Sequence, residues 1–313
     1  MRIAFVTGNY PAPSRPSVGT FVQQFVWAMA RQGHECDVIN PISLFERRYG
    51  ALPPWFAAES AGGGPDVRVH RRSYLSFSSR NLGWTHTGRW TQRTFTAAAK
   101  RAVAGLPARP DLIYGHFLYP AGYAALRLGT ALGRPTVIGV GESFACPDPE
   151  GPGECQPWTL EAFGVRRARR HYARRGYFLA NSTPNGEMLV NLLGISSGRI
   201  RVEPNGVDLG LMHPRDRADM RAKHSIRPNG FLVAFVGSGE ARKGLQRLLA
   251  AINGLPDVYC LAIGRGTEGM VSPRILRSGP VPHGIVPELL ACADVFALPT
   301  TAEGSCTAII EAM

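Results

Sequence analysis

Short apolar runs alternate with amphipathic segments from the start of the chain. "RIAFVTG" (residues 2–8) reads as a buried strand, and "FVQQFVWAMARQG" (residues 21–33) carries apolar residues at helical spacing. The run "ECDVIN" (residues 35–40) follows as a second strand. Continuously apolar strands separated by helices are typical of parallel sheets that are covered on both faces. These residues are therefore predicted to form a β-α-β unit.

The alternation continues along the chain and restarts near Asn205. Further strands of the first half are expected at "VRVHRRS", "PDLIYGHF", "PTVIGVG", "GYFLANS" and "RIRVEPNGVD". After a polar, loop-rich stretch, the pattern returns as "FLVAFVG", "LQRLLAAING", "VYCLAIG", "GIVPELLACA" and "DVFALP". We predict an α/β protein of two Rossmann-like, doubly wound parallel-sheet domains facing a cleft, at residues 1–208 and 209–313. Chemistry is expected in the loops at the carboxyl ends of the strands.

Positive charge is concentrated in the first half. The net charge is +12, and residues 1–208 hold 24 Lys and Arg against 14 Asp and Glu. The densest run is "RRARRHYARR" (residues 166–175), which reads as a helix with six arginines and no acid. Such a helix suits anionic lipid headgroups or a phosphorylated acceptor, and a merely solvated helix is the alternative. Nucleic acid is not expected, because no DNA- or RNA-reading motif accompanies the charge.

Cysteine use and hydropathy favour a reduced, cytoplasmic setting. The basic charge of the first half favours a place at the inner face of a membrane. The opening apolar run is too short for the h-region of a signal peptide, so we expect none, and no apolar run reaches the roughly 18 residues of a membrane span. Cys146 and Cys155 flank the loop "CPDPEGPGEC", whose spacing is not that of a zinc site. We expect these and the other four cysteines to be reduced structural thiols.

The loop "FVGSGEARKG" is a candidate anion site. Gly237 and Gly239 follow a strand, and Lys243 opens the next helix. Small residues let the backbone approach a phosphate, and a lysine near a helix N-terminus attracts anions. The spacing matches neither a P-loop nor a dinucleotide-binding motif.

The closing stretch "EGSCTAIIEAM" carries two glutamates, Glu303 in a loop and Glu311 in a helix. The residues expected to open this helix with free N–H groups are Gly304, Ser305, Cys306 and Thr307. If the segment is fully helical, the glutamates lie about 12 Å apart. A nucleotide-sugar along this helix start would place its diphosphate at the positive end of the helix dipole. The alternative makes Glu303 a loop acid and Glu311 a surface residue.

From Met1 to Met313 the chain resembles the retaining glycosyltransferases of family 4, which have the GT-B architecture. The second half carries the Glu-x7-Glu motif as "EGSCTAIIE", together with "VPHGIVPELLACADVFALPT" and the "FVG…KG" loop. The first half adds "IRVEPNGVD", "IYGHFLYPAGYAA" and "YPAPSRPSVGTFVQQFVWAMARQGHE".

The resemblance implies a role for each matching residue. Glu311 would bind the ribose of the donor, Glu303 the sugar hydroxyls, and Lys243 the diphosphate. Gly19 would lie near the donor phosphates, and His116 would face the acceptor, unless it is a satisfied strand-end histidine. The remaining expected donor-binding residues are Gly237, Gly239, Asn205 and residues 304–307.

The implied reaction is transfer of a hexose with retained configuration, from a nucleotide-sugar to a lipid-linked or glycan acceptor in polysaccharide or glycolipid biosynthesis. Lys243 would stabilise the charge that develops on the leaving diphosphate. The leaving phosphate would accept the proton of the acceptor, so Glu303 orients the sugar rather than attacking it. Neither a metal nor a cofactor is implied beyond the nucleotide-sugar, and the sequence has no Asp-x-Asp motif.

Three departures from the family qualify this prediction. Ser238 stands where the family often has Arg, and Gly141 where it often has His; Arg242, Glu142 or Ser143 would have to compensate. The helix expected from Ser305 has no C-cap after Met313, so we expect a C-terminally truncated chain with an incomplete second sheet, poor solubility or low activity. The alternatives are a non-catalytic nucleotide-binding protein, or an epimerase or phosphorylase on the same fold.

Overall fold

The computed structural model describes residues 1–13, 15–16, 18–49, 51–77, 82, 86–142, 144–145, 156–157, 164–226 and 230–313. The chain divides into two compact units, Met1–Ser143 with Gln156–Pro204 (unit 1) and Phe144–Cys155 with Asn205–Met313 (unit 2). Cys146, Cys155 and the loop between them lie outside the described residues, as does Ser143. No helix within the described ranges combines the length and the apolar character needed to cross a bilayer.

Unit 1 is built on an eight-stranded sheet in the order β10-β9-β6-β5-β1-β2-β4-β3. Every neighbouring pair is parallel except β3 with β4. The strands are β1 (Arg2–Val6), β2 (Glu35–Ser43), β3 (Phe56–Glu59), β4 (Val67–Tyr74), β5 (Leu112–His116), β6 (Thr136–Val140), β9 (Tyr177–Ala180) and β10 (Ile200–Val202). Two short strands, β7 (Phe144–Ala145) and β8 (Gln156–Pro157), are separate from this sheet.

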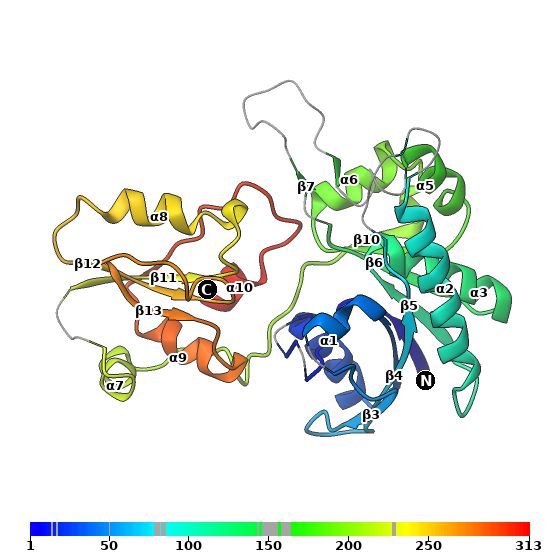
Figure 1. Cartoon of the computed structure of the whole chain (residues 1–313), viewed down its shortest axis with the longest axis horizontal. Helices are drawn as coiled ribbons and strands as arrows, with labels where there is room; N and C mark the ends of the chain where they lie inside the picture. Colours follow the sequence, from blue (N-terminus) through cyan, green and yellow to red (C-terminus); the bar gives the residue numbers. More distant parts are fainter. Residues whose placement is uncertain are drawn as a thin grey trace. The chain divides into compact units, whose positions relative to one another are not determined.

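Helices cover both faces of this sheet (Figure 1). They are α1 (Thr20–Arg31), α2 (Gly88–Ala104), α3 (Tyr123–Leu132), α5 (Val165–Tyr172) and α6 (Thr183–Asn191), with short turns η1 (Leu44–Tyr49), η2 (Leu118–Gly122) and η3 (Ser197–Arg199). Ile3 and Phe5 of β1 pack in one cluster with α1, while Ala4 and Val6 pack in another with α2 and α3. Because successive strand residues face opposite sides, a continuous apolar run fills both clusters.

Unit 2 has a four-stranded sheet in the order β13-β12-β11-β14, and all its pairs are parallel. The strands are β11 (Phe231–Val236), β12 (Val258–Ile263), β13 (Ile275–Gly279) and β14 (Val295–Phe296). The helices and turns are α7 (Arg217–Lys223), η4 (Ala241–Lys243), α8 (Leu245–Ile252), η5 (His283–Ile285), α9 (Val286–Ala291) and α10 (Thr307–Ala312). The core cluster of α8 lies on one face of the sheet, and that of α9 lies on the other.

Among the parallel strands, each sheet reverses its strand order once, and this position marks the sheet edge where a doubly wound fold binds ligands. In unit 1, β1 lies between β2 and β5, so the loops after β1 and β5 flank the reversal. In unit 2, β11 lies between β12 and β14, so the loops after β11 and β14 flank it. We call these two places the switch-point edges of units 1 and 2.

Three local predictions were wrong. The closing helix does not open at Ser305, because Cys306 has an extended backbone (φ −90°, ψ 94°) and α10 begins at Thr307. The arginine-rich run is not one helix, since α5 ends at Tyr172 and two arginines follow it. The strand "RIRVEPNGVD" ends at Val202, two residues before a proline that cannot donate to a ladder.

Candidate functional site

Two loops pack tightly against each other at the switch-point edge of unit 2. The backbone N–H of Thr301, after β14, donates to the carbonyl of Arg242, after β11, at 2.9 Å. Gly244 has a left-handed backbone (φ 83°), and a Cβ there would lie 2.0 Å from the Pro299 carbonyl oxygen. Only glycine fits at position 244. This close approach places the preceding residue, Lys243, against the loop after β14.

Lys243 and Glu303 meet where these loops touch. The Lys243 Nζ lies 2.6 Å from Glu303 Oε1, and the Thr300 hydroxyl donates to the same oxygen at 2.9 Å. Arg242 Nη1 also reaches this oxygen, at 3.4 Å. The side chains of Lys243 and Glu303 are 16% and 18% exposed, so the pair is largely removed from water. No described residue donates to Glu303 Oε2, which leaves this oxygen available to a ligand hydroxyl.

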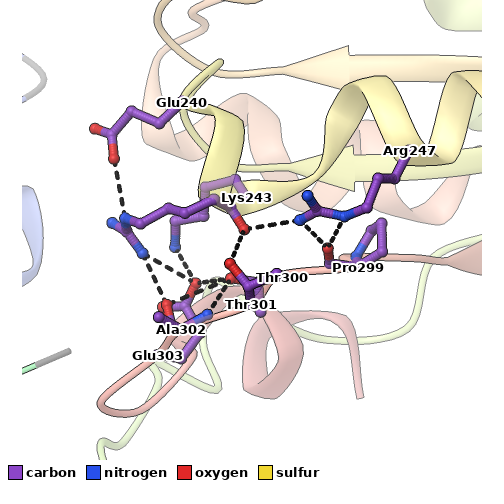
Figure 2. A network of polar contacts seen from close by, with 9 residues as sticks. Glu240, Lys243, Arg247, Pro299, Thr300, Thr301, Ala302 and Glu303 are labelled. Atoms are coloured by element: carbon purple, nitrogen blue, oxygen red, sulfur yellow. Dashed lines mark hydrogen bonds and ion pairs between the residues drawn. The ribbon is translucent and has the colours of Figure 1, made fainter. Parts of the chain in front are cut away.

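Arginine side chains brace the same two loops (Figure 2). Arg242 donates to the Ala302 carbonyl at 2.9 Å and to Glu240 Oε2 at 3.0 Å. Arg247 donates to the Pro299 carbonyl at 2.7 Å and to that of Arg242 at 3.1 Å. These charge-assisted bonds fix the backbone around Glu303, so the carboxylate is held before any ligand arrives.

The glycines after β11 have a packing role in this structure. The N–H of Gly237 donates to the Ile263 carbonyl, and that of Gly239 to the Arg265 carbonyl, each at 2.9 Å. A Cβ on Gly239 would lie 2.1 Å from the Gly266 carbonyl oxygen. These two N–H groups therefore hold the neighbouring loop after β12, and their contact with a phosphate stays a prediction.

Glu311 is anchored in the same way as Glu303. His283, in η5, lies with its Nε2 2.9 Å from Glu311 Oε1, and the Glu311 side chain is only 11% exposed. This hydrogen bond to Glu311 is the largest cause of the raised pKa of His283, and it outweighs the effect of burial. Among described residues nothing donates to Glu311 Oε2. The start of α10 is held by Asn205, whose Nδ2 donates to the Thr307 hydroxyl at 3.2 Å.

The segment between the two glutamates is not fully helical, so the 12 Å spacing expected for a continuous helix does not apply. Gly304 and Ser305 precede α10, and Cys306 is its N-cap without a side-chain cap bond. The donor-binding roles of residues 304–307 stay predictions.

In unit 1, His116 is the last residue of β5, at the switch-point edge. Its ring lies 4.5 Å from that of Phe117 and 5.3 Å from that of Phe21, measured between ring centroids. Both ring nitrogens are buried and have no hydrogen-bond partner within the described ranges. Burial lowers the pKa of His116 to about 4, so the ring is neutral at pH 7. An unpaired buried polar group costs about 1–3 kcal/mol, so this ring does not stabilise the fold through hydrogen bonds to described residues.

Gly19 joins the loop after β1 to α1 in unit 1. Its backbone is left-handed (φ 74°), and a Cβ would lie 2.5 Å from the carbonyl group of Asn9. The glycine therefore allows the start of α1 to pack against the loop after β1.

Glu142, considered as a substitute for the family histidine, is bonded to backbone. It is 3% exposed and accepts from the N–H groups of Leu118, at 2.5 Å, and Gly141, at 3.1 Å. Burial raises its pKa to about 7. Glu142 thus secures the turn after β5 that follows His116.

Sequence reasoning missed Thr300 and His283 and set Arg242 aside. His283 lies in "VPHG", within a stretch that resembles the family, and nothing in its spacing points to Glu311. Three-residue clusters of His, Cys, Asp or Glu suited to a metal ion do not occur among the described residues.

Comparison with known proteins identifies the class. Residues 18–211 match the family described as Glycosyltransferase Family 4, and residues 216–313 match Glycosyl transferases group 1. The chain therefore belongs to the family 4 glycosyltransferases, enzymes of the GT-B fold that transfer a sugar from a nucleotide-sugar. This confirms the family and fold predicted from the sequence.

Two curated relatives share about a quarter of their aligned residues with this chain. The chain is 24% identical to TuaC of Bacillus subtilis, named for teichuronic acid biosynthesis, over all of this chain and 78% of that protein. It is 27% identical to D-inositol 3-phosphate glycosyltransferase of Segniliparus rotundus, over 70% of this chain and 52% of that protein.

Among solved structures, sucrose-phosphate synthase of Thermosynechococcus elongatus is similar over all of this chain and 78% of its own, with a TM-score of 0.74 and 19% identity. Anabaena HepE in complex with UDP-glucose has a TM-score of 0.57 and 17% identity, with the same coverage.

Proposed function

We propose that the protein is a retaining, metal-independent glycosyltransferase that moves a hexose from a nucleotide-sugar to a lipid-linked or glycan acceptor. The observation that carries this proposal is the Lys243–Glu303 pair, held at 2.6 Å on the switch-point edge of unit 2. A nucleotide-sugar needs a cation to bind its diphosphate and a hydrogen-bond acceptor to bind its sugar hydroxyls. Lys243 would provide the cation, and the carboxylate of Glu303 would provide the acceptor.

Both glutamates are arranged to receive hydroxyl groups. Each is fixed through Oε1, by Lys243 for Glu303 and by His283 for Glu311, and each has an Oε2 that accepts from no described residue. Glu303 would hold hydroxyls of the sugar, and Glu311 hydroxyls of the ribose. Because Oε1 of each is already bonded, little side-chain freedom is lost on binding.

Lys243 would act on the leaving group. When the bond from the anomeric carbon to the diphosphate breaks, negative charge develops on the phosphate oxygen and positive charge on the sugar. A fixed ammonium at this oxygen stabilises the charge as it forms, and such a donor is worth about 3–4 kcal/mol. The departing phosphate would take the proton of the acceptor hydroxyl, so the new bond forms on the face that the diphosphate leaves.

The acceptor side is assigned to unit 1. His116 is neutral at pH 7, since burial lowers its pKa to about 4, and neither nitrogen is bonded to a described residue. A neutral imidazole offers one donor and one acceptor, which suits a hydroxyl-bearing acceptor. The basic charge of residues 1–208 favours an acceptor that carries phosphate, such as a lipid-linked glycan.

A donor panel tests this function. The protein would be incubated with a series of nucleotide-sugars and a membrane lipid extract, with nucleoside diphosphate and glycosylated product followed by mass spectrometry. We expect release from one donor and a loss of about ten- to hundredfold in Glu303→Gln, the range of a hydrogen bond to a charged group. Glu268→Gln is the matched control, because Glu268 is an exposed acid of unit 2 and no described residue bonds to it.

The alternatives give different results in the same panel. Nucleotide binding without release from any donor would indicate a non-catalytic protein, and sugar isomerisation without acceptor would indicate an epimerase. Release that depends on free phosphate would indicate a phosphorylase.

A further inference from the structure

Unit 1 has a cavity of about 280 Å³ on its helical surface, lined by none of the candidate site residues. Residues from α2, from α3 and from the segment after α5 line it: Thr96, Lys100, Arg127, Thr130, Ala131 and Arg175. Half of these residues are cations, and they come from three separate parts of the chain. The fold therefore gathers three positive charges around one hollow.

Among the described residues, no acidic side chain pairs with these cations. The side chains of Lys100, Arg127 and Arg175 are exposed, and none of them forms a hydrogen bond or ion pair with a described residue. The helices α2, α3 and α5 contain no Asp or Glu. Like charges gathered at one place raise the local positive potential, which attracts an anion.

The neighbouring His171 responds to the same positive potential. Burial is the largest cause of its lowered pKa of about 4, and Arg127, Arg175 and Arg167 lower it further. His171 therefore stays neutral at pH 7 and adds no charge of its own to this face. Two of these three arginines line the cavity, which places their charges close together.

The hydrogen-bond donors free to bind a ligand at this cavity belong to its cations, because its two threonine hydroxyls already donate to backbone carbonyls. The hydroxyl of Thr96 donates to the Gln92 carbonyl at 2.7 Å, and that of Thr130 to the Leu126 carbonyl at 2.9 Å. Their protons are thus already used within α2 and α3. The exposed side chains of Lys100, Arg127 and Arg175, whose aliphatic stems help to line the cavity, supply one ammonium and two guanidinium groups beside it. This set matches an acceptor-only group with several charged oxygens.

We propose that this cavity binds a phosphate group, with Arg127 and Arg175 as bidentate donors and Lys100 as a point charge. The phosphate belongs either to an anionic lipid headgroup or to a soluble phosphate ester, and the chemistry of recognition is the same for both. The site is independent of the sugar-transfer function, because its residues are separate from Lys243, Glu303, Glu311 and His116.

The first arm of the test uses a soluble probe. Glycerol 1-phosphate would be titrated by calorimetry into the wild type and into Lys100→Gln/Arg127→Gln/Arg175→Gln, at an ionic strength where charges beyond about 8 Å are screened. Its matched control, Arg93→Gln/Arg166→Gln/Arg170→Gln, removes the same charge from exposed arginines of α2 and α5 that do not line the cavity. We expect at least about a tenfold weakening in the cavity variant and less than about twofold in the control.

The second arm distinguishes the sources by sedimentation with vesicles of phosphatidylcholine, with or without phosphatidic acid. Binding that requires phosphatidic acid, and that is lost in the cavity variant but kept in the control, identifies a lipid headgroup. Binding of glycerol 1-phosphate without this vesicle preference identifies a soluble ester. Equal losses in the two triple variants, or no binding of either probe by the wild type, overturns the proposal.

Arg127→Lys provides a milder variant that keeps the charge but removes the planar fork. Thermal unfolding of every variant would be measured alongside. If Arg127→Lys has the melting temperature of the wild type and binds the probes several-fold more weakly, bidentate recognition by Arg127 is supported. Unchanged binding excludes it.

Discussion

Replacing Lys243 by Met is the sharpest perturbation of the candidate site. The change removes the ammonium 2.6 Å from Glu303 Oε1 but keeps a side chain of similar length. Glu303 retains the Thr300 hydroxyl at 2.9 Å and Arg242 at 3.4 Å, so its carboxylate stays partly compensated. We expect the fold to survive, with a loss in the free energy of unfolding of about 1–3 kcal/mol.

The effect on turnover is expected to be larger than the effect on stability. Removing one preorganised donor from a group that becomes charged in the transition state costs about 10²–10³ in kcat, or about 3–4 kcal/mol. The donor KM should rise less than kcat falls, because Lys243 acts most strongly on the charge that forms as the diphosphate leaves.

Lys223→Met is the matched control, assayed by nucleoside diphosphate release at several donor concentrations. Lys223 Nζ lies 2.9 Å from Glu288 Oε1, and Glu288 keeps His224 at 2.8 Å when the lysine is lost. The control therefore breaks a lysine–glutamate pair in the same unit, from α7 rather than from the switch-point edge. If Lys243→Met keeps kcat within about threefold, or if Lys223→Met loses as much, the role given to Lys243 is refuted.

Substitutions of three further residues, His283, Gly244 and His116, give testable predictions. His283→Gln should raise the donor KM about two- to tenfold with little change in kcat, since it loosens Glu311. Because the pKa of His283 is raised above 6.5, its contribution to the free energy of unfolding is full below pH 6.5 and fades as the pH rises through the raised value; urea titrations of both proteins across pH would show this. Gly244→Ala should cost at least about 1–3 kcal/mol in chemical denaturation, whereas Gly254→Ala, with no atom within 4 Å of the new Cβ, should cost less than about 1. His116→Phe should keep or raise the melting temperature while transfer falls at least about tenfold, and a parallel loss of both would contradict a functional role.

The order of strands and helices could be predicted because the signal is local. A continuous apolar run such as "FLVAFVG" is buried on both faces of a parallel sheet, and β11 at Phe231–Val236 fits this run. The order of strands within the sheet could not be predicted in the same way. Lys243 and Glu303 are 60 residues apart, and they meet because β14 pairs with β11 through two residue pairs.

Element ends were the weakest part of the prediction. "GSCT" reads as a helix opening, but Cys306 is extended, and the first helical residue, Thr307, is bound by Asn205, which is 102 residues away. The role of His283 was equally hidden, since a histidine before a helix has many uses and only the fold places it against Glu311. The family resemblance therefore predicted Glu303, Glu311 and Lys243 as site residues, while the contacts among them and with Thr300 and His283 depended on tertiary structure.

Calorimetric titration of nucleoside diphosphates tests the central claim most directly, because it asks whether the switch-point edge of unit 2 is the donor site. The proteins would be the wild type, Glu311→Gln and the exposed-acid control Glu268→Gln. We predict that the wild type binds one nucleotide, that Glu311→Gln weakens this binding about ten- to hundredfold, and that the control leaves it unchanged. Equal affinity in Glu311→Gln and the wild type, or no binding of any nucleotide by the wild type, would contradict the account.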